Sequence, residues 1–242
     1  MESFKVRILT TYNQKIYDFS AHKLIESSRK FLPDVQILEY NEDRVHEIPE
    51  FVNVFKANKD IILKAQGGDA DSIPSTGGWQ FNSRWFNWFK KIAVQYDCIK
   101  RNKYNGYTLF FDADIRIINT FSQEQIDLPK AIGIFQGNRE IAETGFLILN
   151  ENNFGVIEFY DQLIQFYLSG EFRKYFRWDD SFSITKIKNR NPDLVEDLAK
   201  NACAGEFTNT NNHSTAQQII PFTKWGKYVE HDKGIHCRNN IS

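Results

Sequence analysis

The sequence has little of several features that define whole classes of protein. Its only cysteines are Cys98, Cys203 and Cys237, an odd number with no Cys-x-x-Cys spacing, so neither a disulfide framework nor a zinc cluster is indicated. It has no apolar run of about 20 residues that would span a bilayer and no apolar segment behind a basic start, as a signal peptide would have. We therefore expect a soluble protein of a reducing compartment, the cytoplasm.

The sequence also lacks an excess of either charge. With 30 basic and 31 acidic side chains, the formal net charge is −1, which gives no global electrostatic footprint for nucleic acid or for an anionic membrane. We expect no nucleic-acid partner, and any anion site must be local. Methionine occurs once, whereas there are 21 Phe, 10 Tyr and 5 Trp, so aromatic residues supply much of the core. A chain of 242 residues fits one α/β domain of ordinary size.

The most informative stretch is a β-prone apolar run that ends in two carboxylates. Residues 108–111 are suited to a buried strand, and Asp112 and Asp114 come directly after it. On an extended chain residues two apart share a face, and Ala113 between them is small enough to leave the space above it open. Two such carboxylates repel each other unless a cation lies between them, and Mg²⁺ or Mn²⁺ binds carboxylate oxygens together with substrate phosphates. The alternative is that the aspartates only end the strand and cap the next segment of the chain.

The N-terminal segment has the strand, polar turn and helix with which many α/β ligand sites begin. Residues 4–11 predict a first strand and a helix extends to about Lys30, with Thr10, Thr11, Tyr12 and Asn13 at the turn between them. In open α/β sheets ligands bind beyond the carboxyl ends of the strands, so these residues fall where a nucleotide base would lie. An ordinary turn, in which Asn and Thr satisfy backbone groups, is the alternative.

The remaining elements are predicted from apolar spacing and from turn residues. We predict further strands over 35–38, 131–135 and 147–150, and helices over 49–58, 79–101, 153–169, 181–188 and 192–200. A glycine-dense loop over 66–78 contains a second Asp-x-Asp, Asp69 to Asp71, but no strand precedes it to hold the carboxylates in place. We interpret it as a mobile loop, with a lid over the ligand as the alternative.

Three further groups of polar residues are candidates for a site. Arg84 and Lys91 lie seven residues apart on one face of the predicted helix over 79–101, where cations can cover a solvated flank. Glu143 precedes a small hydroxyl residue, a glycine and an apolar strand. Asp179 and Asp180 come after Trp178, where one of them can cap the next helix.

The C-terminal segment gathers imidazoles and cations around a glycine in a chain that is otherwise poor in histidine. Its relevant members are His231, Lys233, Gly234, His236 and Arg238. Such a segment can present two cations and a backbone amide to a diphosphate while an imidazole completes a metal shell.

Together these motifs resemble those of a known enzyme family. Asp112-Ala113-Asp114 is similar to the Asp-x-Asp motif of nucleotide-sugar-dependent glycosyltransferases of the GT-A fold. The C-terminal segment resembles the His-x-x-Gly segment of retaining glycosyltransferases of the glycogenin and lipopolysaccharide galactosyltransferase type, here of bacterial or viral kind. In that family the His is a metal ligand and a later Lys binds phosphate. The expected position of that Lys is Cys237 in this chain, with Arg238 next and Lys233 before it.

The resemblance implies a fold, an activity and a set of site residues. It implies one GT-A-like α/β domain over residues 1–242, with a mixed, mostly parallel sheet flanked by helices, a nucleotide-binding part over about 1–118 and an acceptor-side part over about 119–242. Mn²⁺ or Mg²⁺ would be held by Asp112, Asp114 and His231. The donor, a nucleoside diphosphate sugar with UDP favoured, would contact Thr10, Thr11, Tyr12, Asn13, Arg84, Lys91, Asp112, Ala113, Lys233, Gly234 and Arg238.

On the acceptor side the resemblance implies that Glu143 and its neighbours hold substrate hydroxyls. Asp180, or Asp179, would be the base of an inverting enzyme or would stabilise positive charge on the sugar in a retaining one. The resulting activity is transfer of a hexosyl group to an acceptor hydroxyl in glycan or polysaccharide synthesis, with retention favoured because of the His231 segment. Two alternatives stay open, a nucleotidyltransferase and an inactive carbohydrate-binding protein of the same fold. Nucleotidyltransferases usually have a glycine-rich, basic loop straight after the first strand, whereas residues 10–15 of this chain contain no glycine.

Overall fold

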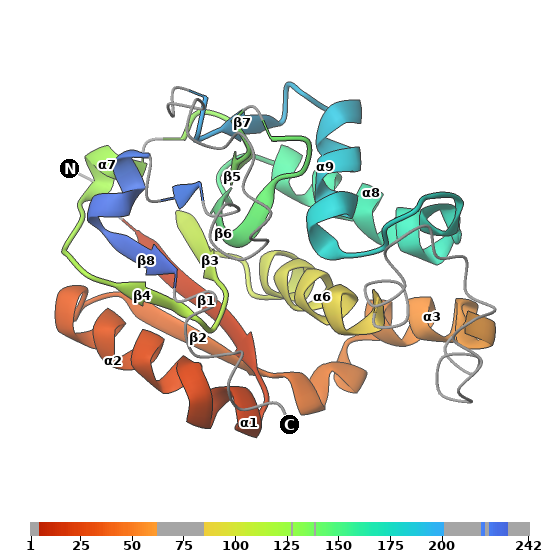
Figure 1. Cartoon of the computed structure of the whole chain (residues 1–242), viewed down its shortest axis with the longest axis horizontal. Helices are drawn as coiled ribbons and strands as arrows, with labels where there is room; N and C mark the ends of the chain where they lie inside the picture. The colour runs from red at the N-terminus through yellow and green to blue at the C-terminus, as the bar shows by residue number, and fades with distance from the viewer. Residues whose placement is uncertain are drawn as a thin grey trace, which may run out of the picture.

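A computed structural model of the chain describes residues 5–61, 85–126, 128–137, 139–200, 219–220 and 223–231. Its strands are β1 Val6–Tyr12, β2 Gln36–Asn41, β3 Tyr107–Phe111, β4 Ile115–Ile117, β5 Ile132–Phe135, β6 Glu143–Asn150, β7 Val195–Asp197 and β8 Val229–His231. Six of them form one sheet in the order β2-β1-β3-β6-β5-β7, and β4 pairs with β8 in a second sheet (Figure 1). β1 is parallel to β2 and β3, and β7 to β5, whereas β6 runs antiparallel to β3 and β5. The predicted α/β class with a mixed, mostly parallel sheet is confirmed.

Helices cover both faces of the large sheet. They are α1 Gln14–Ile16, α2 His22–Phe31, α3 Pro49–Ala57, α6 Trp85–Arg101, α7 Gln123–Ile126, α8 Gly155–Leu168 and α9 Asp180–Arg190, with a π-helical turn Tyr17–Ala21 and 3₁₀ turns Glu42–Glu47, Glu171–Lys174 and Lys224–Lys227. α3, α6, α8 and α9 pack against one another on one face, while α2 packs beside β4 (Figure 1).

The alternation of side chains along the strands divides the core into two clusters. Leu9 and Phe110 face the cluster formed with α3, α6, α8 and α9, whereas Ile8, Leu109 and Phe111 face the cluster that includes α2, β4 and β8. All five of these side chains are fully buried. A sheet that is apolar on both faces explains why its strands are near-continuous apolar runs in the sequence.

Most predicted elements occur, with boundaries shifted by a few residues, but the predicted helix over 192–200 is wrong. β7 lies there instead and pairs with β5. Val195 is buried opposite Ile132, and the carboxylate of Asp197 accepts hydrogen bonds from the backbone amides of Gln136, Gly137 and Ala199. Side-chain acceptors of this kind compete with helical hydrogen bonds, and edge pairing buries Val195 better than an isolated helical turn would.

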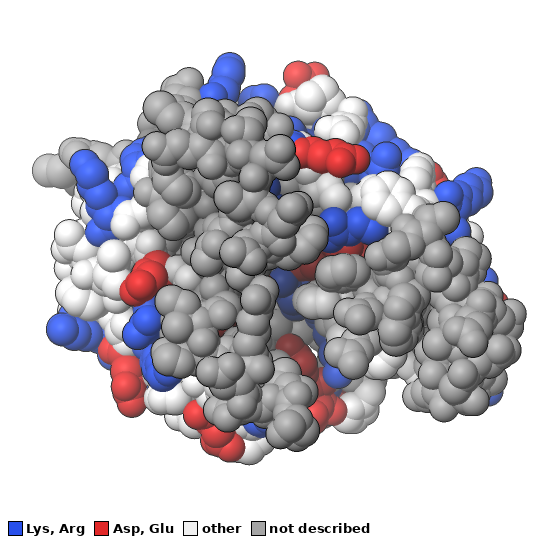
Figure 2. Space-filling view, viewed as in Figure 1, with Lys and Arg blue, Asp and Glu red and all other residues white. Residues whose placement is uncertain are grey.

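The surface of the described part mixes both charges. In the view of Figure 2, Lys and Arg side chains and Asp and Glu side chains both occur around the described rim of the molecule. Within the described ranges, no helix combines the length and the apolar character needed to cross a bilayer.

Candidate metal centre and nucleotide pocket

The two aspartates of the Asp-x-Asp motif lie in a tight turn between β3 and β4. Asp112 donates its backbone amide to the carbonyl of Gly145 at 2.7 Å, and its own carbonyl accepts from the amide of Ile115 at 3.0 Å. The chain therefore turns here, whereas the spacing of the two aspartates predicted an extended segment. The turn still keeps the Asp112 and Asp114 carboxylates close together.

The strand β8 brings His231 to this turn from a point 117 residues further along the chain. β8 runs antiparallel to β4, with His231 opposite Ile115 and Val229 opposite Ile117. The preceding turn is anchored by Trp225, which is fully buried and makes an edge contact with Phe146. Strand pairing and aromatic packing thus fix the imidazole beside Asp114.

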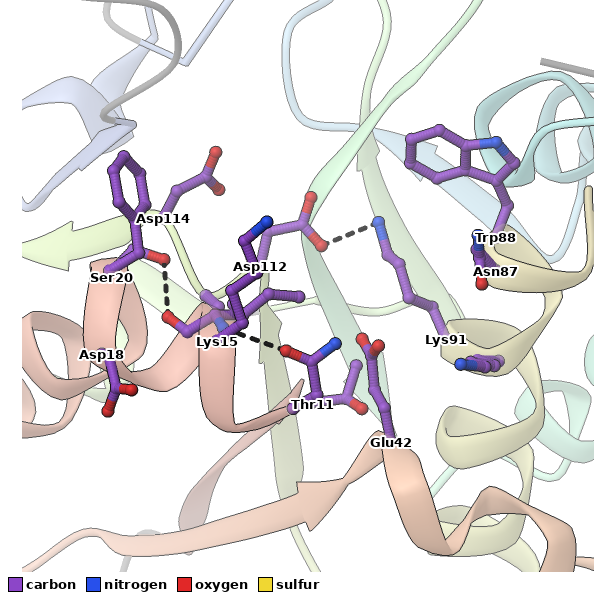
Figure 3. Close-up of a pocket in the computed structure, with 15 residues that line it drawn as sticks. Thr11, Lys15, Asp18, Ser20, Glu42, Asn87, Trp88, Lys91, Asp112 and Asp114 are labelled. Carbon is purple, nitrogen blue, oxygen red and sulfur yellow. Dashed lines mark hydrogen bonds and ion pairs between the residues drawn. The ribbon is translucent and has the colours of Figure 1, made fainter. Parts of the chain in front are cut away.

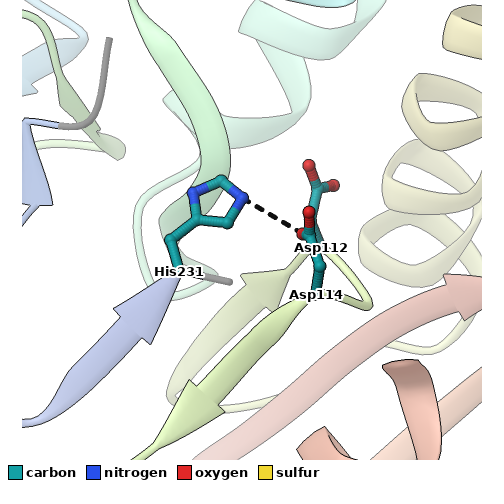
Figure 4. A group of neighbouring side chains, drawn as sticks. All are labelled: Asp112, Asp114 and His231. Carbon is teal, nitrogen blue, oxygen red and sulfur yellow. Dashed lines mark hydrogen bonds and ion pairs between the residues drawn. The ribbon is translucent and has the colours of Figure 1, made fainter. Parts of the chain in front are cut away.

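These three side chains have the composition and spacing of a divalent metal site. The nearest ligand atoms of Asp112, Asp114 and His231 all lie within 4.8 Å of one another, and His231 Nε2 is 3.1 Å from Asp114 Oδ1 (Figure 4). Two carboxylates and one imidazole suit Mn²⁺ or Mg²⁺ with further oxygen ligands from a substrate. The residues present therefore fit the metal that the resemblance implies.

Gly145 on β6 provides the space that the cluster occupies. A Cβ atom at this position would lie 2.8 Å from His231 Cε1, 3.2 Å from Glu143 Oε1 and 3.3 Å from Asp112 Oδ2. The first of these contacts is shorter than a carbon–carbon contact allows. Only glycine lets the imidazole of His231 and the carboxylates of Glu143 and Asp112 approach this strand so closely.

Lys91 on α6 joins the metal cluster to Asp180. Its Nζ lies 2.7 Å from Asp112 Oδ1 and 2.7 Å from Asp180 Oδ2, and its side chain is only 11% exposed (Figure 3 shows the Asp112 contact). Burial alone would lower the pKa of the Lys91 ammonium, but the carboxylates of Asp112 and Asp180 more than offset this and hold the pKa above its usual range. Lys91 is therefore a buried cation between two carboxylates, and the solvated-flank alternative is wrong for it.

The adjacent aspartates at the start of α9 have different surroundings. Asp180 is buried, and its Oδ2 accepts a hydrogen bond from the hydroxyl of Thr144 at 2.9 Å as well as the contact from Lys91. Asp179 is the N-cap of α9, accepting from the amide of Phe182 at 3.0 Å and from Arg177 Nε at 2.7 Å. Asp180 thus faces the candidate centre, while both oxygens of Asp179 are engaged in capping and in an ion pair.

Glu143 is the first residue of β6 and is buried, not exposed ahead of the strand. Its Oε1 lies 4.0 Å from His231 Nδ1, and its Oε2 lies 3.6 Å from Arg139. It therefore lies beside the imidazole of the metal cluster, on the side opposite the Asp114 contact.

A pocket of about 950 Å³ opens next to the metal cluster, beyond the carboxyl ends of β1 and β3. Among the sequence-predicted residues, those that line it are Thr11, Asn13, Lys91, Asp112, Ala113 and Asp114 (Figure 3). Its volume is in the range of nucleotide-sized ligand sites. Thr11 is only 5% exposed, and its hydroxyl has no hydrogen-bond partner among the described residues. An unpaired buried hydroxyl at a pocket wall is available for a ligand.

Two residues predicted for the base-binding turn do not line this pocket. Thr10 is fully buried on the other face of β1, and the hydroxyl of Tyr12 donates to the carboxylate of Glu39. Asn13 lines the pocket while its side chain also caps α1 by accepting from the amide of Ile16 at 3.0 Å.

The sequence interpretation missed Glu42, which comes directly after β2 and points into the pocket between Thr11 and Lys91 (Figure 3). Burial raises the pKa of its carboxyl above the usual range, and Asp112 adds to this, although Lys90 and Lys91 act in the opposite direction. Trp88 and Lys15 also line the pocket and were not predicted. The only signal for Glu42 was its place just after a strand parallel to β1.

Several predicted residues lie outside the described residues. They are Arg84, Lys233, Gly234, Arg238 and the second Asp-x-Asp at Asp69 to Asp71.

Comparisons with known proteins give similarity of structure only. No family model matches the chain, and no curated protein sequence matches it. A solved glycosyltransferase involved in the glycosylation of the major capsid of PBCV-1 aligns over 94% of both chains with a TM-score of 0.49 and 12% identity. Apo mouse xyloside xylosyltransferase 1 aligns over 81% of this chain and 84% of its own, with a TM-score of 0.47 and 12% identity.

The glycosyltransferase GlyE of Streptococcus pneumoniae TIGR4 aligns over 81% of this chain but 45% of its own, with a TM-score of 0.48 and 12% identity. At these identities and TM-scores the similarities add nothing to the functional argument, which therefore rests on the geometry of the site.

Proposed function

We propose that this protein is a metal-dependent glycosyltransferase of the GT-A type that moves a sugar from a nucleoside diphosphate sugar to an acceptor hydroxyl. The observation that carries the proposal is the convergence of Asp112, Asp114 and His231 at the edge of a pocket beyond the carboxyl ends of parallel strands. That is the position where open α/β sheets bind nucleotides. The chain then comprises a nucleotide-binding part over about 1–118 and an acceptor-side part over about 119–242.

Asp112, Asp114 and His231 would hold Mn²⁺ or Mg²⁺. When bound, such an ion acts as a Lewis acid that stabilises the negative charge developing on the leaving diphosphate. The chain adds its own cation, because the Lys91 ammonium lies at the rim of the same pocket and in contact with Asp112. We assign Lys91 to the donor phosphates, together with Arg84, Lys233, Gly234 and Arg238.

The pocket wall supplies groups for the nucleoside. We assign Thr11 and Asn13 to the base and ribose, with UDP as the favoured nucleotide. The hydroxyl of Thr11 can donate or accept one hydrogen bond and has no partner among the described residues. Glu42 adds a carboxylate acceptor at the same wall. Thr10 and Tyr12 would support this turn through packing and through the Tyr12 contact with Glu39.

Asp180 is our candidate for the acidic group at the reacting centre. Its Oδ2 is held by the Lys91 ammonium and by the hydroxyl of Thr144, so this oxygen is not placed to take a proton from an acceptor hydroxyl. A carboxylate fixed in this way suits stabilisation of positive charge on the sugar better than general-base catalysis. This supports the retaining outcome over the inverting one, and Asp179 then serves to cap α9.

An activity assay across donors tests the proposal. The protein is incubated with UDP-, GDP-, CMP- and dTDP-sugars, with Mn²⁺ or with EDTA. Nucleotide release by donor hydrolysis is measured, in which water takes the place of the acceptor hydroxyl. We expect metal-dependent release of UDP from one donor and its loss in Asp114→Asn. Release of pyrophosphate from a nucleoside triphosphate and a sugar phosphate would instead identify a nucleotidyltransferase. Absence of metal-dependent binding of any of these nucleotides to the folded protein would instead favour the inactive carbohydrate-binding protein.

A further inference from the structure

We infer that Glu143 is a positioning residue of the metal centre, whose carboxylate orients the imidazole of His231 so that Nε2 faces the metal. This inference rests on the proposed metal site and changes the part that Glu143 plays in it. The sequence placed Glu143 with the substrate hydroxyls on the acceptor side. The structure gives it a different neighbour, the ring of His231.

The two nitrogens of His231 face two different carboxylates. Nε2 lies 3.1 Å from Asp114 Oδ1, within the cluster of ligand atoms, and Nδ1 lies 4.0 Å from Glu143 Oε1. In the metal-free protein the nearer carboxylate is that of Asp114, within hydrogen-bond distance of Nε2, whereas the carboxylate of Glu143 lies beyond that distance from Nδ1. An ion held by Asp112 and Asp114 would need the lone pair of Nε2, and the ring proton would then lie on Nδ1, where the carboxylate of Glu143 attracts it. Histidine ligands commonly have a carboxylate behind them for this reason.

Glu143 itself is held in place by its surroundings. Its Oε1 accepts a hydrogen bond from the backbone amide of Gly145 at 3.2 Å, and Arg139 lies 3.6 Å from Oε2. The Glu143 side chain is 6% exposed and the His231 side chain is fully buried, so solvent screens their interaction little. The missing side chain of Gly145 leaves the room in which the carboxylate and the imidazole approach each other.

The position of Glu143 argues against direct contact with the donor. It does not line the pocket that Asp112 and Asp114 line, and it lies beside His231 of the metal cluster. A residue that touches substrate would change turnover without changing the affinity of the free protein for metal. A residue that orients His231 must change the affinity for metal even when no nucleotide is present.

The test compares Glu143→Gln with Glu140→Gln by calorimetric titration of Mn²⁺ into the nucleotide-free protein. Glu140 lies three residues before Glu143 and is exposed, and no hydrogen bond or ion pair of its side chain occurs among the described residues, so it is a matched control. We expect Glu143→Gln to weaken Mn²⁺ binding about tenfold, in the range found for residues behind a metal ligand. Glu140→Gln should bind Mn²⁺ as the wild type does. Thermal unfolding of the metal-free proteins checks that both variants are folded.

A second readout uses Mg²⁺ in place of paramagnetic Mn²⁺. Nitrogen-15 NMR of the imidazole reports which ring nitrogen carries the proton, and we expect Mg²⁺ to shift His231 to the Nδ1–H tautomer in the wild type and to do so less completely in Glu143→Gln at the same Mg²⁺ concentration. Equal Mn²⁺ affinity in Glu143→Gln and wild type, with an unchanged tautomer, would overturn the inference while leaving the proposed function in place. Failure of the wild type itself to bind Mn²⁺ would refute the metal site and the inference together.

Discussion

Replacing Lys91 by methionine tests the buried bridge that joins the metal cluster to Asp180. Methionine keeps most of the length and apolar surface of the lysine stem but removes the ammonium. Asp112 and Asp180 then lose a partner that lies 2.7 Å from each of them. Breaking a buried ion pair by removing one member costs about 3–5 kcal/mol, because an uncompensated charge remains in a poorly solvated site. The free energy of unfolding of Lys91→Met should fall by about this amount, which corresponds to roughly 6–20 °C in Tm for a chain of this size.

The assay is urea unfolding monitored by the fluorescence of the five tryptophans. Lys90→Met is the matched control, because Lys90 is adjacent on α6 and is only partly buried. Its effect should stay within about 0.5 kcal/mol, as for most surface substitutions. A double variant, Lys91→Met with Asp180→Asn, should recover part of the lost stability, since it removes one of the two uncompensated charges.

Equal stability of Lys91→Met and Lys90→Met would refute this reasoning, because it would mean that the ammonium contributes nothing to holding the two carboxylates. A double variant that is less stable than Lys91→Met would also contradict it. In that case Asp180 would depend on contacts other than the one with Lys91.

Three further predictions concern the pocket and its wall. Thr11→Val should leave the free energy of unfolding unchanged, because the Thr11 hydroxyl has no hydrogen-bond partner among the described residues. The same variant should bind UDP about 2- to 12-fold more weakly in calorimetry, which is the effect of losing one hydrogen bond. Gly145→Ala should weaken Mn²⁺ binding while the protein stays folded, since its Cβ would lie 2.8 Å from His231 Cε1; unchanged affinity would show that the ring moves freely. The pKa of the Glu42 carboxyl is raised in the folded protein, so folding favours the protonated acid. The contribution of Glu42 to the free energy of unfolding is therefore full below the unfolded pKa and is lost as the pH rises through the folded pKa. Glu42→Gln should therefore raise Tm at pH 8 relative to wild type, with the difference vanishing near pH 4.

The sequence predicted the sheet and the members of the candidate metal cluster because both depend on local patterns. The apolar strands are buried on both faces, so they are near-continuous runs. The carboxylates of Asp112 and Asp114 come directly after one of these runs, and His231 was found as an imidazole in a segment dense in cations.

The features that the sequence did not predict depend on contacts between distant segments. Pairing of β8 with β4 places His231 beside Asp114, and α6 presents Lys91 to two carboxylates at once. Neither contact has a signature in residue spacing. The predicted helix over 192–200 failed for the same reason, since pairing of Val195 with β5 decides the structure there. Glu42 escaped notice because a single acid after a strand is common in any sequence.

The most direct test of the central claim is calorimetric titration of UDP into the folded protein, once with Mn²⁺ and once with EDTA. We predict binding that requires Mn²⁺, because Asp112, Asp114 and His231 would hold the ion and its charge would favour the diphosphate. UDP binding of equal affinity with and without the metal, or no UDP binding in either condition, would contradict the account.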